Sequence, residues 1–452
     1  MEWEVIPIKK ALSFFLCAAM IGQLCSCSGG GRSVIILTNR EEVLATVNSA
    51  DAATENEHKT YLQLVLDEAV GIIADVKGID ETKAGKQLYR GGYTIYTAYD
   101  AEVSDRLTDA CDERTADMDA AAVITDTEGW VCAVYSNDDG DTNFATAQYP
   151  PCSAIKPLSV YAPAVENGTI DWFTRYEDSP YLYLTNADGT RQPWPSNANN
   201  VYSHEQTFVS QAVKESTNTI AVKCLSDYGV LNSISFMEQH FGISLETEKS
   251  IATGKGEDEI IGNIALGSFV NGVSPVDMAG YYQVFANGGF YQAPRTITKI
   301  CDKDGTEIYA ATYDPAKVLK RSTSATMNYL LQEVVSAGGT GKEAACRGIK
   351  VAGKTGTDDD YKNNWFVAVT PEYCCSFWHG RYTSNVTTQL FSAAMTRIYE
   401  DKTDKEADFP HLRSVRQVAY CPESGKQYTA SCPSVEMGYC LPDQPLSRCD
   451  QH

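Results

Sequence analysis

A serine and a lysine stand three residues apart in "PPCSAIKPLSVYA", residues 150–162, where an apolar stretch begins. In a helix this spacing places Ser153 and Lys156 on one face. A lysine that loses water has its pKa lowered, and a neutral lysine can accept a proton. Because a serine hydroxyl is a weak nucleophile until a base takes its proton, the pair indicates nucleophilic catalysis by Ser153 with Lys156 as base. The alternative is a lysine that extends its amine to solvent from the edge of a helix.

A second polar motif, Ser216-Thr217-Asn218, lies between two segments that we expect to be helical, "FVSQAVKE" and "TIAVKCLSDYG". A hydroxyl in such a loop can relay a proton to a leaving nitrogen, and an asparagine amide can both donate and accept hydrogen bonds. Taken alone, the motif is more typical of an ordinary helix cap. Together with the first motif, it makes Ser216 and Asn218 catalytic candidates.

The third motif, Lys354-Thr355-Gly356-Thr357, ends a segment with the pattern of a strand, "KVAGKTGT". Alternate strand residues share a face, so Thr355 and Thr357 point together and their hydroxyls can hold a carboxylate. Lys354 adds positive potential nearby, and Gly356 allows a substrate to lie along the strand. The backbone N–H groups of Ser153 and Thr357 are the expected oxyanion hole.

The same stretch, Gly348 to Thr355, also fits the phosphate-loop pattern G-x-x-x-x-G-K-T. A phosphate loop needs a helix that begins at the Lys-Thr pair. Here the residues before that pair have the pattern of a strand, and "GTDDDYKNNW" after it has that of a turn. We therefore exclude nucleotide binding at this motif.

These candidates need a small set of elements to bring them together. The pattern predicts a helix over 60–76, a strand within 91–100, a hairpin over 120–136 and a helix from Ser153 to about Glu166. Late strands are expected over 350–357, 364–369 and 373–380. Early strands, then mostly helices, then strands again indicate an α+β domain whose sheet is assembled from both ends of the chain.

Composition limits the class of protein. The chain has 452 residues, 43% hydrophobic and 21% charged, which suits two or three globular domains. Its net charge of -22 and the lack of a long basic run exclude nucleic acid as a partner and make attraction to anionic lipid weak. The 15 cysteines form no C-x-x-C pair, so neither a metal site nor a cofactor is predicted.

The first 27 residues differ from the rest. Two lysines precede an apolar run from about Ala11 to Leu24, which is signal-peptide length and short for a membrane span. The run ends in Leu24-Cys25-Ser26-Cys27, which resembles a bacterial lipobox with Cys27 as the lipidated residue. A retained anchor is the alternative, and both place the body on the extracytoplasmic face of the cell membrane. We expect a polar tether over 28–58, a linker region over 59–105, the catalytic domain over 106–400 and a cysteine-containing tail over 401–452.

Several longer stretches carry a family resemblance: "YRGGYTIYTAYD", "NFATAQYPPCSAIKP", "ALGSFVNGVSPVDMAGYYQVFANGGFY", "GGTGKEA", "VAGKTGT" and "NWFVAVTPEY". With the three motifs, the chain from about Tyr61 onward resembles the transpeptidase part of class A penicillin-binding proteins. The resemblance implies a serine β-lactamase/D,D-peptidase-like fold, an antiparallel sheet covered by helices. It also implies that Ser153 attacks the D-Ala-D-Ala bond of peptidoglycan stem peptides, that an amine accepts the acyl group, and that β-lactams acylate the same serine.

Two departures from that family qualify the expectation, and one further resemblance extends it. Only a short polar segment precedes the region of resemblance, so we expect no glycosyltransferase activity and a separate glycosyltransferase as partner. Cys152 replaces the glycine that usually precedes the nucleophile. The segment "CPESGKQYTASCP" resembles the tail of certain class A members, which implies a Cys421–Cys432 disulfide.

Other functions of such a pocket remain open from the sequence. A D,D-carboxypeptidase would use water in place of the amine, and a low-turnover β-lactam sensor or scaffold would acylate without further reaction. A β-lactamase needs a carboxylate that activates water against the acyl-enzyme. Glu259 has the spacing of that residue relative to Asn263, but Gly262 stands where the β-lactamase loop has leucine.

Overall fold

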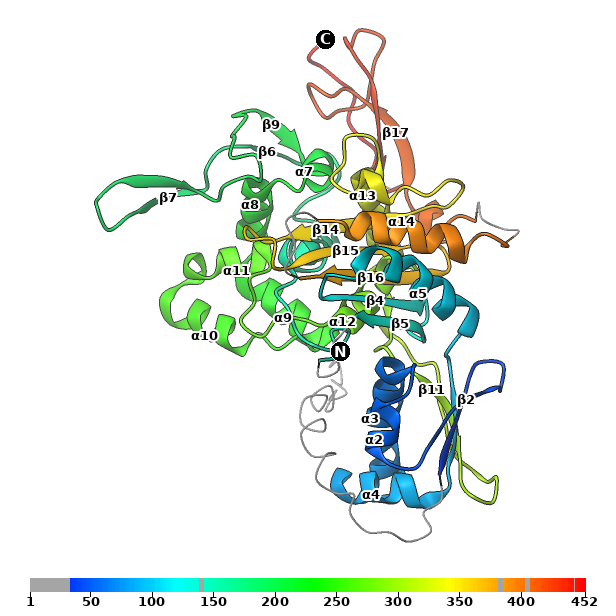
Figure 1. Cartoon of the computed structure of the whole chain (residues 1–452). Helices are drawn as coiled ribbons and strands as arrows, with labels where there is room; N and C mark the ends of the chain where they lie inside the picture. The colour runs from blue at the N-terminus through cyan, green and yellow to red at the C-terminus, as the bar shows by residue number, and fades with distance from the viewer. Residues whose placement is uncertain (1–32, 138–141, 381–384, 403–406, 443) are drawn as a thin grey trace, which may run out of the picture. The chain divides into compact units, whose positions relative to one another are not determined.

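The computed structural model describes residues 33–137, 142–380, 385–402, 407–442 and 444–452 (Figure 1). By its internal contacts the chain divides into two compact units. Of the described residues, the smaller unit comprises those up to Ser104 together with Trp130–Val134 and Arg295–Tyr313, and the larger unit comprises those within Asp105–Gly129, Tyr135–Pro294 and Asp314–His452. All eight candidate residues from Ser153 to Thr357 belong to the larger unit.

The smaller unit is built on a five-stranded sheet with the order β12-β11-β3-β1-β2. Its helix α3 packs on β11 and β12 and, as the pattern of Leu62, Val65 and Ile73 predicts, turns an apolar face inward. Its elements are β1 (Val34–Leu37), β2 (Val43–Val47), α2 (Ala50–Thr54), α3 (Lys59–Lys77), α4 (Glu81–Gly91), β3 (Thr94–Thr97), β11 (Ile297–Cys301) and β12 (Glu307–Ala310).

The structure differs from the sequence prediction over residues 28–58. Where a polar tether is expected, the described part of this segment contains β1, β2 and α2. The physical reason is the run Val34-Ile-Ile-Leu37, in which Val34 and Ile36 are fully buried and β1 pairs with both β2 and β3. An apolar run of strand length outweighs the polar composition around it.

The central sheet of the larger unit has the order β14-β15-β16-β4-β5 and combines strands from both ends of the chain, as the sequence predicts. Figure 1 shows these strands side by side. Neighbours from β14 to β4 run antiparallel. Every residue of β15 is buried, so both faces of the sheet are covered. The strands are β4 (Ala120–Asp126), β5 (Val131–Asn137, of which only Tyr135–Asn137 belong to the larger unit), β14 (Ala352–Thr357), β15 (Asn364–Val369) and β16 (Tyr373–His379).

Helices supply the rest of the core. Helix α12 packs on β4, β15 and β16, α14 packs on β15 and β16, and α13 packs on β14. The helices of this unit are α5 (Ala101–Thr115), α6 (Ala162–Asn167), α7 (Val209–Glu215), α8 (Asn218–Tyr228), α9 (Val230–Phe241), α10 (Glu246–Lys255), α11 (Ile261–Leu266), α12 (Pro275–Tyr282), α13 (Arg321–Val335) and α14 (Thr387–Ile398).

The segment that carries the first motif is helical, as predicted, but it changes geometry along its length. A 3-10 turn, η1 (Cys152–Ile155), leads into a π-helical stretch, η2 (Pro157–Tyr161), and then into α6, which ends at Gly168 with φ +83. Residues 157–164 are all buried. The candidate serine is therefore a partly exposed residue at the start of a helix that runs into the core.

The described part of the larger unit also contains four two-stranded β-ribbons. The predicted cysteine-containing tail contains one of them, β17–β18, which packs beside α13. The ribbon strands are β6 (Arg175–Glu177) with β9 (Gln206–Phe208), β7 (Leu182–Thr185) with β8 (Arg191–Trp194), β10 (Phe290–Tyr291) with β13 (Ala316–Lys317), and β17 (Arg416–Tyr420) with β18 (Glu436–Cys440).

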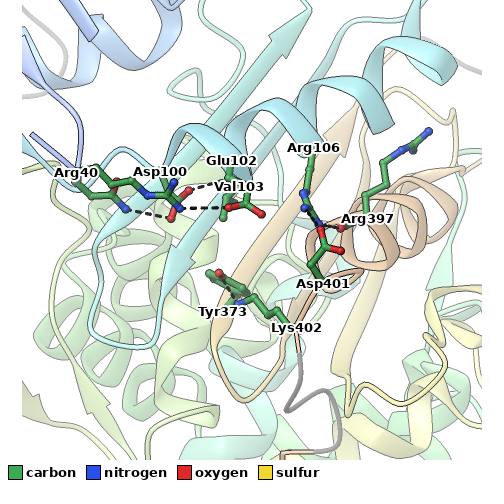
Figure 2. Close-up of polar contacts among 10 residues, drawn as sticks. Arg40, Asp100, Glu102, Val103, Arg106, Tyr373, Arg397, Asp401 and Lys402 are labelled. Atoms are coloured by element: carbon green, nitrogen blue, oxygen red, sulfur yellow. Dashed lines mark hydrogen bonds and ion pairs between the residues drawn. The ribbon is translucent and has the colours of Figure 1, made fainter. Parts of the chain in front are cut away.

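Ion pairs join α5 to the end of α14 within the larger unit. Arg106 donates to the carbonyl oxygen of Arg397 and, at 2.5 Å, to the carboxylate of Asp401 (Figure 2). Arg397 in turn donates to Glu113 at 2.7 Å. Because Asp401 and Glu113 are largely exposed, these pairs orient the two helices but contribute little to stability.

Within the described ranges, no helix combines the length and apolar character that crossing a membrane requires. The leader over 1–27, including Cys27, lies outside the described residues.

Candidate active site

Residues from the first two motifs meet around the amine of Lys156. This side chain is fully buried, so the alternative of a solvent-exposed amine is wrong. Its Nζ donates to Asn218 Oδ1 at 2.6 Å and to the Ser216 carbonyl oxygen at 3.0 Å, and lies 3.4 Å from Ser216 Oγ. An amine held by neutral oxygens on a buried helix face is a structural arrangement suited to proton transfer.

The third motif reaches the same point through Lys354. This lysine is also fully buried, and its Nζ donates to Ser216 Oγ at 2.8 Å and to the Thr355 carbonyl oxygen at 3.0 Å. The Ser216 hydroxyl thus lies between the two amines. Three stretches that are far apart in the sequence converge on one serine.

Ser153 lies at the open side of this group. It is partly exposed, and its Oγ takes part in none of the hydrogen bonds formed among the described residues. Its carbonyl oxygen accepts the backbone N–H of Lys156, which fixes the short turn between them. The hydroxyl is therefore available to a ligand, while the amine one turn along is directed at Ser216 and Asn218.

The electrostatics of the two lysines follow from their burial. Burial lowers the pKa of Lys156 well below its usual value, and the neighbouring charge of Lys354 lowers it further. Burial also lowers the pKa of Lys354, to about 7. Among the described residues, neither amine is hydrogen-bonded to a carboxylate. The site thus consists of two amines, hydroxyls and an amide, which is not a typical set of metal ligands.

The loop with Ser216 and Asn218 is held in a strained but well-supported conformation. Ser216 ends α7 with φ +61, in the left-handed region. Asn197 Oδ1 accepts the N–H groups of the first two residues of α8, at 3.0 and 3.3 Å. Asn218 Nδ2 donates to the carbonyl oxygen of Ser196 at 2.7 Å, which leaves Oδ1 for the amine of Lys156. The sequence analysis missed Asn197, because no motif marks a cap supplied from so distant a segment.

Strand β14 alternates between a buried face and a partly exposed one. Lys354 and Gly356 are buried, whereas Thr355 and Thr357 are partly exposed, as the predicted strand requires. A Cβ atom on Gly356 would lie 2.8 Å from the carbonyl oxygen of Pro151 and 2.9 Å from the backbone nitrogen of Ala154. The glycine therefore lets β14 pack directly on the turn that carries the candidate serine, a packing reason that the sequence analysis did not identify.

Two residues outside the motifs extend the polar row on the exposed face of β14. Thr355 Oγ1 donates to Thr340 Oγ1 at 2.8 Å, and Thr357 Oγ1 accepts from Asn385 Nδ2 at 2.9 Å. Thr340 belongs to the "GGTGKEA" stretch of the sequence, whereas no pattern marks Asn385. Hydroxyl and amide groups in this row can bind a carboxylate of a ligand.

Cys152 has a backbone conformation that favours glycine. Its φ is +51, and its backbone N–H donates to the carbonyl oxygen of Gly267 at 3.1 Å. The side chain is buried, and burial raises the pKa of its thiol. The glycine that the resembled family has at this position is thus explained by the left-handed turn.

The strain at Cys152 gives a stability prediction. Both Cys152→Ala and Cys152→Gly remove the buried thiol, but only glycine relieves the left-handed conformation, which costs a residue with a Cβ about 1–2 kcal/mol. We expect the glycine variant to be the more stable of the two by about 1 kcal/mol, measured as the free energy of unfolding in urea. A glycine variant less stable than the alanine variant would show that this turn is not strained.

The chain is similar to known proteins over most of its length. The family model for the penicillin binding protein transpeptidase domain matches residues 120–374. "Penicillin-binding protein 1A" of Clostridium botulinum is 29% identical over 345 residues, 71% of this chain and 40% of that protein. "Penicillin-binding protein 4" of Bacillus subtilis is 27% identical over 363 residues, 75% of this chain and 55% of that protein. The chain thus spans about half the length of the curated relatives it matches.

Solved structures show the same fold. The D,D-transpeptidase domain of a peptidoglycan glycosyltransferase from Eggerthella lenta aligns with a TM-score of 0.62 at 17% identity, over 83% of this chain and 100% of that one. PonA1 of Mycobacterium tuberculosis in complex with penicillin V aligns with a TM-score of 0.61 at 20% identity, over 76% and 95%. The predicted α+β fold, with its antiparallel sheet covered by helices, is confirmed. With the family model spanning more than half of its residues, the chain belongs to the penicillin-binding protein transpeptidase family.

Proposed function

We propose that the larger unit is a serine D,D-transpeptidase that cross-links peptidoglycan stem peptides through an acyl-enzyme on Ser153. The observation that carries the proposal is the buried amine of Lys156, one turn from the partly exposed Ser153 and hydrogen-bonded to Asn218 and Ser216. A buried lysine with a lowered pKa is costly to stability and has a clear use as a general base. We assign the activity to residues 106–400 and treat 401–452 as an appended tail.

In the acylation step, Ser153 Oγ attacks the carbonyl carbon of the D-Ala-D-Ala peptide bond, and neutral Lys156 takes the hydroxyl proton. The backbone N–H groups of Ser153 and Thr357 stabilise the oxyanion of the tetrahedral intermediate. The Ser216 hydroxyl, between the two amines, then passes its proton to the leaving nitrogen and regains one from protonated Lys156, and D-Ala departs. An ester on Ser153 remains.

In the transfer step, an amine from a second stem peptide attacks the ester. Lys156 takes the proton of this amine and passes it to Ser153 Oγ as the ester bond breaks, which restores Ser153. Thr355 and Thr357 hold the terminal carboxylate of the donor, and Lys354 adds whatever positive charge it carries at the working pH. Water in place of the amine gives a D,D-carboxypeptidase, the second candidate. A low-turnover β-lactam sensor or scaffold would form the ester on Ser153 and react no further.

β-Lactams are expected to acylate the same serine, and the resulting ester is expected to hydrolyse slowly. Glu259, the glutamate at β-lactamase-like spacing, is an exposed residue of the short turn η3 (Glu257–Glu259). An exposed carboxylate outside the buried polar group is poorly suited to activating water against an acyl-enzyme. We therefore expect the penicilloyl ester to persist for minutes or longer, and fast decay that Glu259→Gln removes would identify a β-lactamase instead.

The lowered lysine pKa values predict a pH profile for acylation. Lys156 acts only when neutral, so the rate should rise with pH along a limb centred well below the usual lysine pKa of about 10.4. Because the charge of Lys354 helps to lower the pKa of Lys156, Lys354→Met should move this limb to higher pH. Lys354→Arg keeps a cation and should leave the limb in place or move it to lower pH. A limb that Lys354→Met leaves unchanged would contradict the coupling of the two amines.

Product partition tests the reaction itself. We expect purified protein, given a donor peptide ending in D-Ala-D-Ala and an acceptor amine, to release D-Ala and to form cross-linked product in a proportion that rises with acceptor concentration. Mass spectrometry of the products measures this ratio, and Ser153→Ala is the blank. Trimmed donor alone at every acceptor concentration would establish a carboxypeptidase.

The cellular setting follows from the same proposal. Stem peptides lie outside the cytoplasm, so we place the protein on the extracytoplasmic face of the cell membrane, through lipidated Cys27 or a retained N-terminal anchor. A glycosyltransferase on another chain would supply the glycan strands. Labelled fatty acid should enter the wild-type protein but not the Cys27→Ser variant; a mature N-terminus upstream of Cys27 would support the retained anchor.

A further inference from the structure

The tail brings together three thiols and an imidazole. Cys421, Cys432 and Cys449 form a cluster with 0%, 8% and 8% of their surfaces exposed. The potential ligand atoms of Cys421, Cys449 and His452 all lie within 4.8 Å of one another. These residues come from three separate stretches, so the local sequence does not account for their proximity.

The backbone of the tail is folded around this cluster. Cys421 directly follows β17, and a tight turn links its N–H to the carbonyl oxygen of Lys426 and its own carbonyl oxygen to the N–H of Gly425, each at 2.8 Å. Gly425 has φ +71, which a residue with a side chain rarely adopts. The N–H of Cys449 donates to the carbonyl oxygen of Gln427 at 2.9 Å, which ties the last segment to this turn.

The sulfur atoms are surrounded by hydrogen-bond donors. Ser424 Oγ lies 3.3 Å from Cys449 Sγ, and the Thr429 N–H lies 3.3 Å from Cys432 Sγ. Donors of this kind stabilise thiolates, which are the form of cysteine that binds metals.

The imidazole is held by a carboxylate. His452 Nε2 lies 3.1 Å from Glu423 Oε2. In metalloproteins a histidine ligand usually has its second ring nitrogen hydrogen-bonded to such a group, which fixes the ring and its tautomer. The contact with Glu423 leaves His452 Nδ1 for a ligand.

We propose that Cys421, Cys432, Cys449 and His452 bind one Zn²⁺ ion in a closed, structural site. Three sulfurs and one imidazole nitrogen are a recognised ligand set for tetrahedral zinc. With Zn–S bonds of about 2.3 Å, tetrahedral geometry places ligand atoms roughly 3.8 Å apart, and the ligand atoms of Cys421, Cys449 and His452 lie within 4.8 Å of one another. Cys432 belongs to the same buried cluster and supplies the fourth ligand. Four protein ligands leave no position for substrate, so the ion would hold the tail together and take no part in the acyl transfer.

This site competes with the Cys421–Cys432 disulfide that the family resemblance implies. In the structure both cysteines are free thiols, and Cys449 lies in the same cluster. A disulfide would use two of the three thiols and would leave Cys449 and the carboxylate-held His452 without a common role. The sequence analysis predicted no metal site because it searched for C-x-x-C pairs, whereas Cys449-Asp-Gln-His452 pairs a cysteine with a histidine at that spacing.

The test measures metal in the purified full chain, prepared in zinc-containing medium and dialysed without chelator. We expect about one zinc per chain by elemental mass spectrometry. Cys432→Ser, Cys449→Ser and His452→Ala should each lower that content at least severalfold after dialysis against a mild competing chelator. Cys440→Ser is the matched control, since Cys440 is a buried tail cysteine outside the cluster, and it should retain the ion. Cobalt substitution should give sulfur-to-metal charge-transfer absorption in wild type and Cys440→Ser.

Other outcomes would overturn the proposal. Protein without zinc whose intact mass is two hydrogens lighter, with a linked Cys421–Cys432 peptide, would establish the disulfide. Zinc that the cluster variants retain would be adventitious. Penicillin labelling of each variant separates loss of the ion from collapse of the whole protein, because a labelled variant without zinc has kept its catalytic unit folded.

Discussion

Replacing Lys156 by alanine should slow acylation of Ser153 by a β-lactam at least about 10²-fold, the usual effect of losing a general base. The reason is the placement of the amine: it is fully buried, it donates to Asn218 Oδ1 at 2.6 Å, and burial lowers its pKa. Stopped-flow or quench-flow measurement of the acylation rate constant over a range of β-lactam concentrations separates this effect from weaker binding.

Two controls keep the Lys156 prediction specific. Lys255→Ala removes an exposed lysine at the end of α10 and should leave the rate unchanged. The free energy of unfolding of Lys156→Ala should be measured in parallel, because the variant leaves Asn218 Oδ1 and the Ser216 carbonyl oxygen without their partner. A folded Lys156→Ala variant that acylates at the wild-type rate would show that Lys156 is not the general base.

The sequence predicted the candidate catalytic residues better than the contacts that hold them in place. Ser153, Lys156, Ser216, Asn218 and Lys354 could be named in advance because each stands in a short motif with a chemical reason for its residue type. The same patterns predicted the helix after Ser153 and the strands β14 to β16. Hydrophobic alternation and local spacing are enough to place such elements.

The supporting contacts could not be predicted, because they join segments that are distant along the chain. Asn197 caps α8 from a loop before β9, and Asn385 reaches Thr357 from the segment before α14. Neither stands in a recognisable pattern. The packing reason for Gly356 likewise depends on the approach of β14 to Pro151 and Ala154, which only the three-dimensional structure contains.

One prediction of the sequence analysis was wrong, and one backbone feature was not predicted, each for a physical reason. The polar composition of residues 28–58 hid the apolar run that forms β1, because a mean over the segment conceals a strand of four residues. The positive φ at Cys152 was not predicted, since cysteine rarely adopts it and the one sign of the left-handed turn was the glycine that the resembled family has at this position. At Cys152 the tertiary structure overrides the local preference of the residue type.

The central claim is that Ser153 is the acylated nucleophile, and intact-protein mass spectrometry after exposure to benzylpenicillin tests it most directly. The account predicts a gain of one β-lactam mass per chain, located by peptide mapping on the peptide that contains Ser153, and complete loss of that gain in Ser153→Ala. Ser159→Ala is a matched control, since Ser159 lies buried on the same helical segment and should leave the labelling intact. Labelling at another residue, or undiminished labelling of Ser153→Ala, would contradict the account.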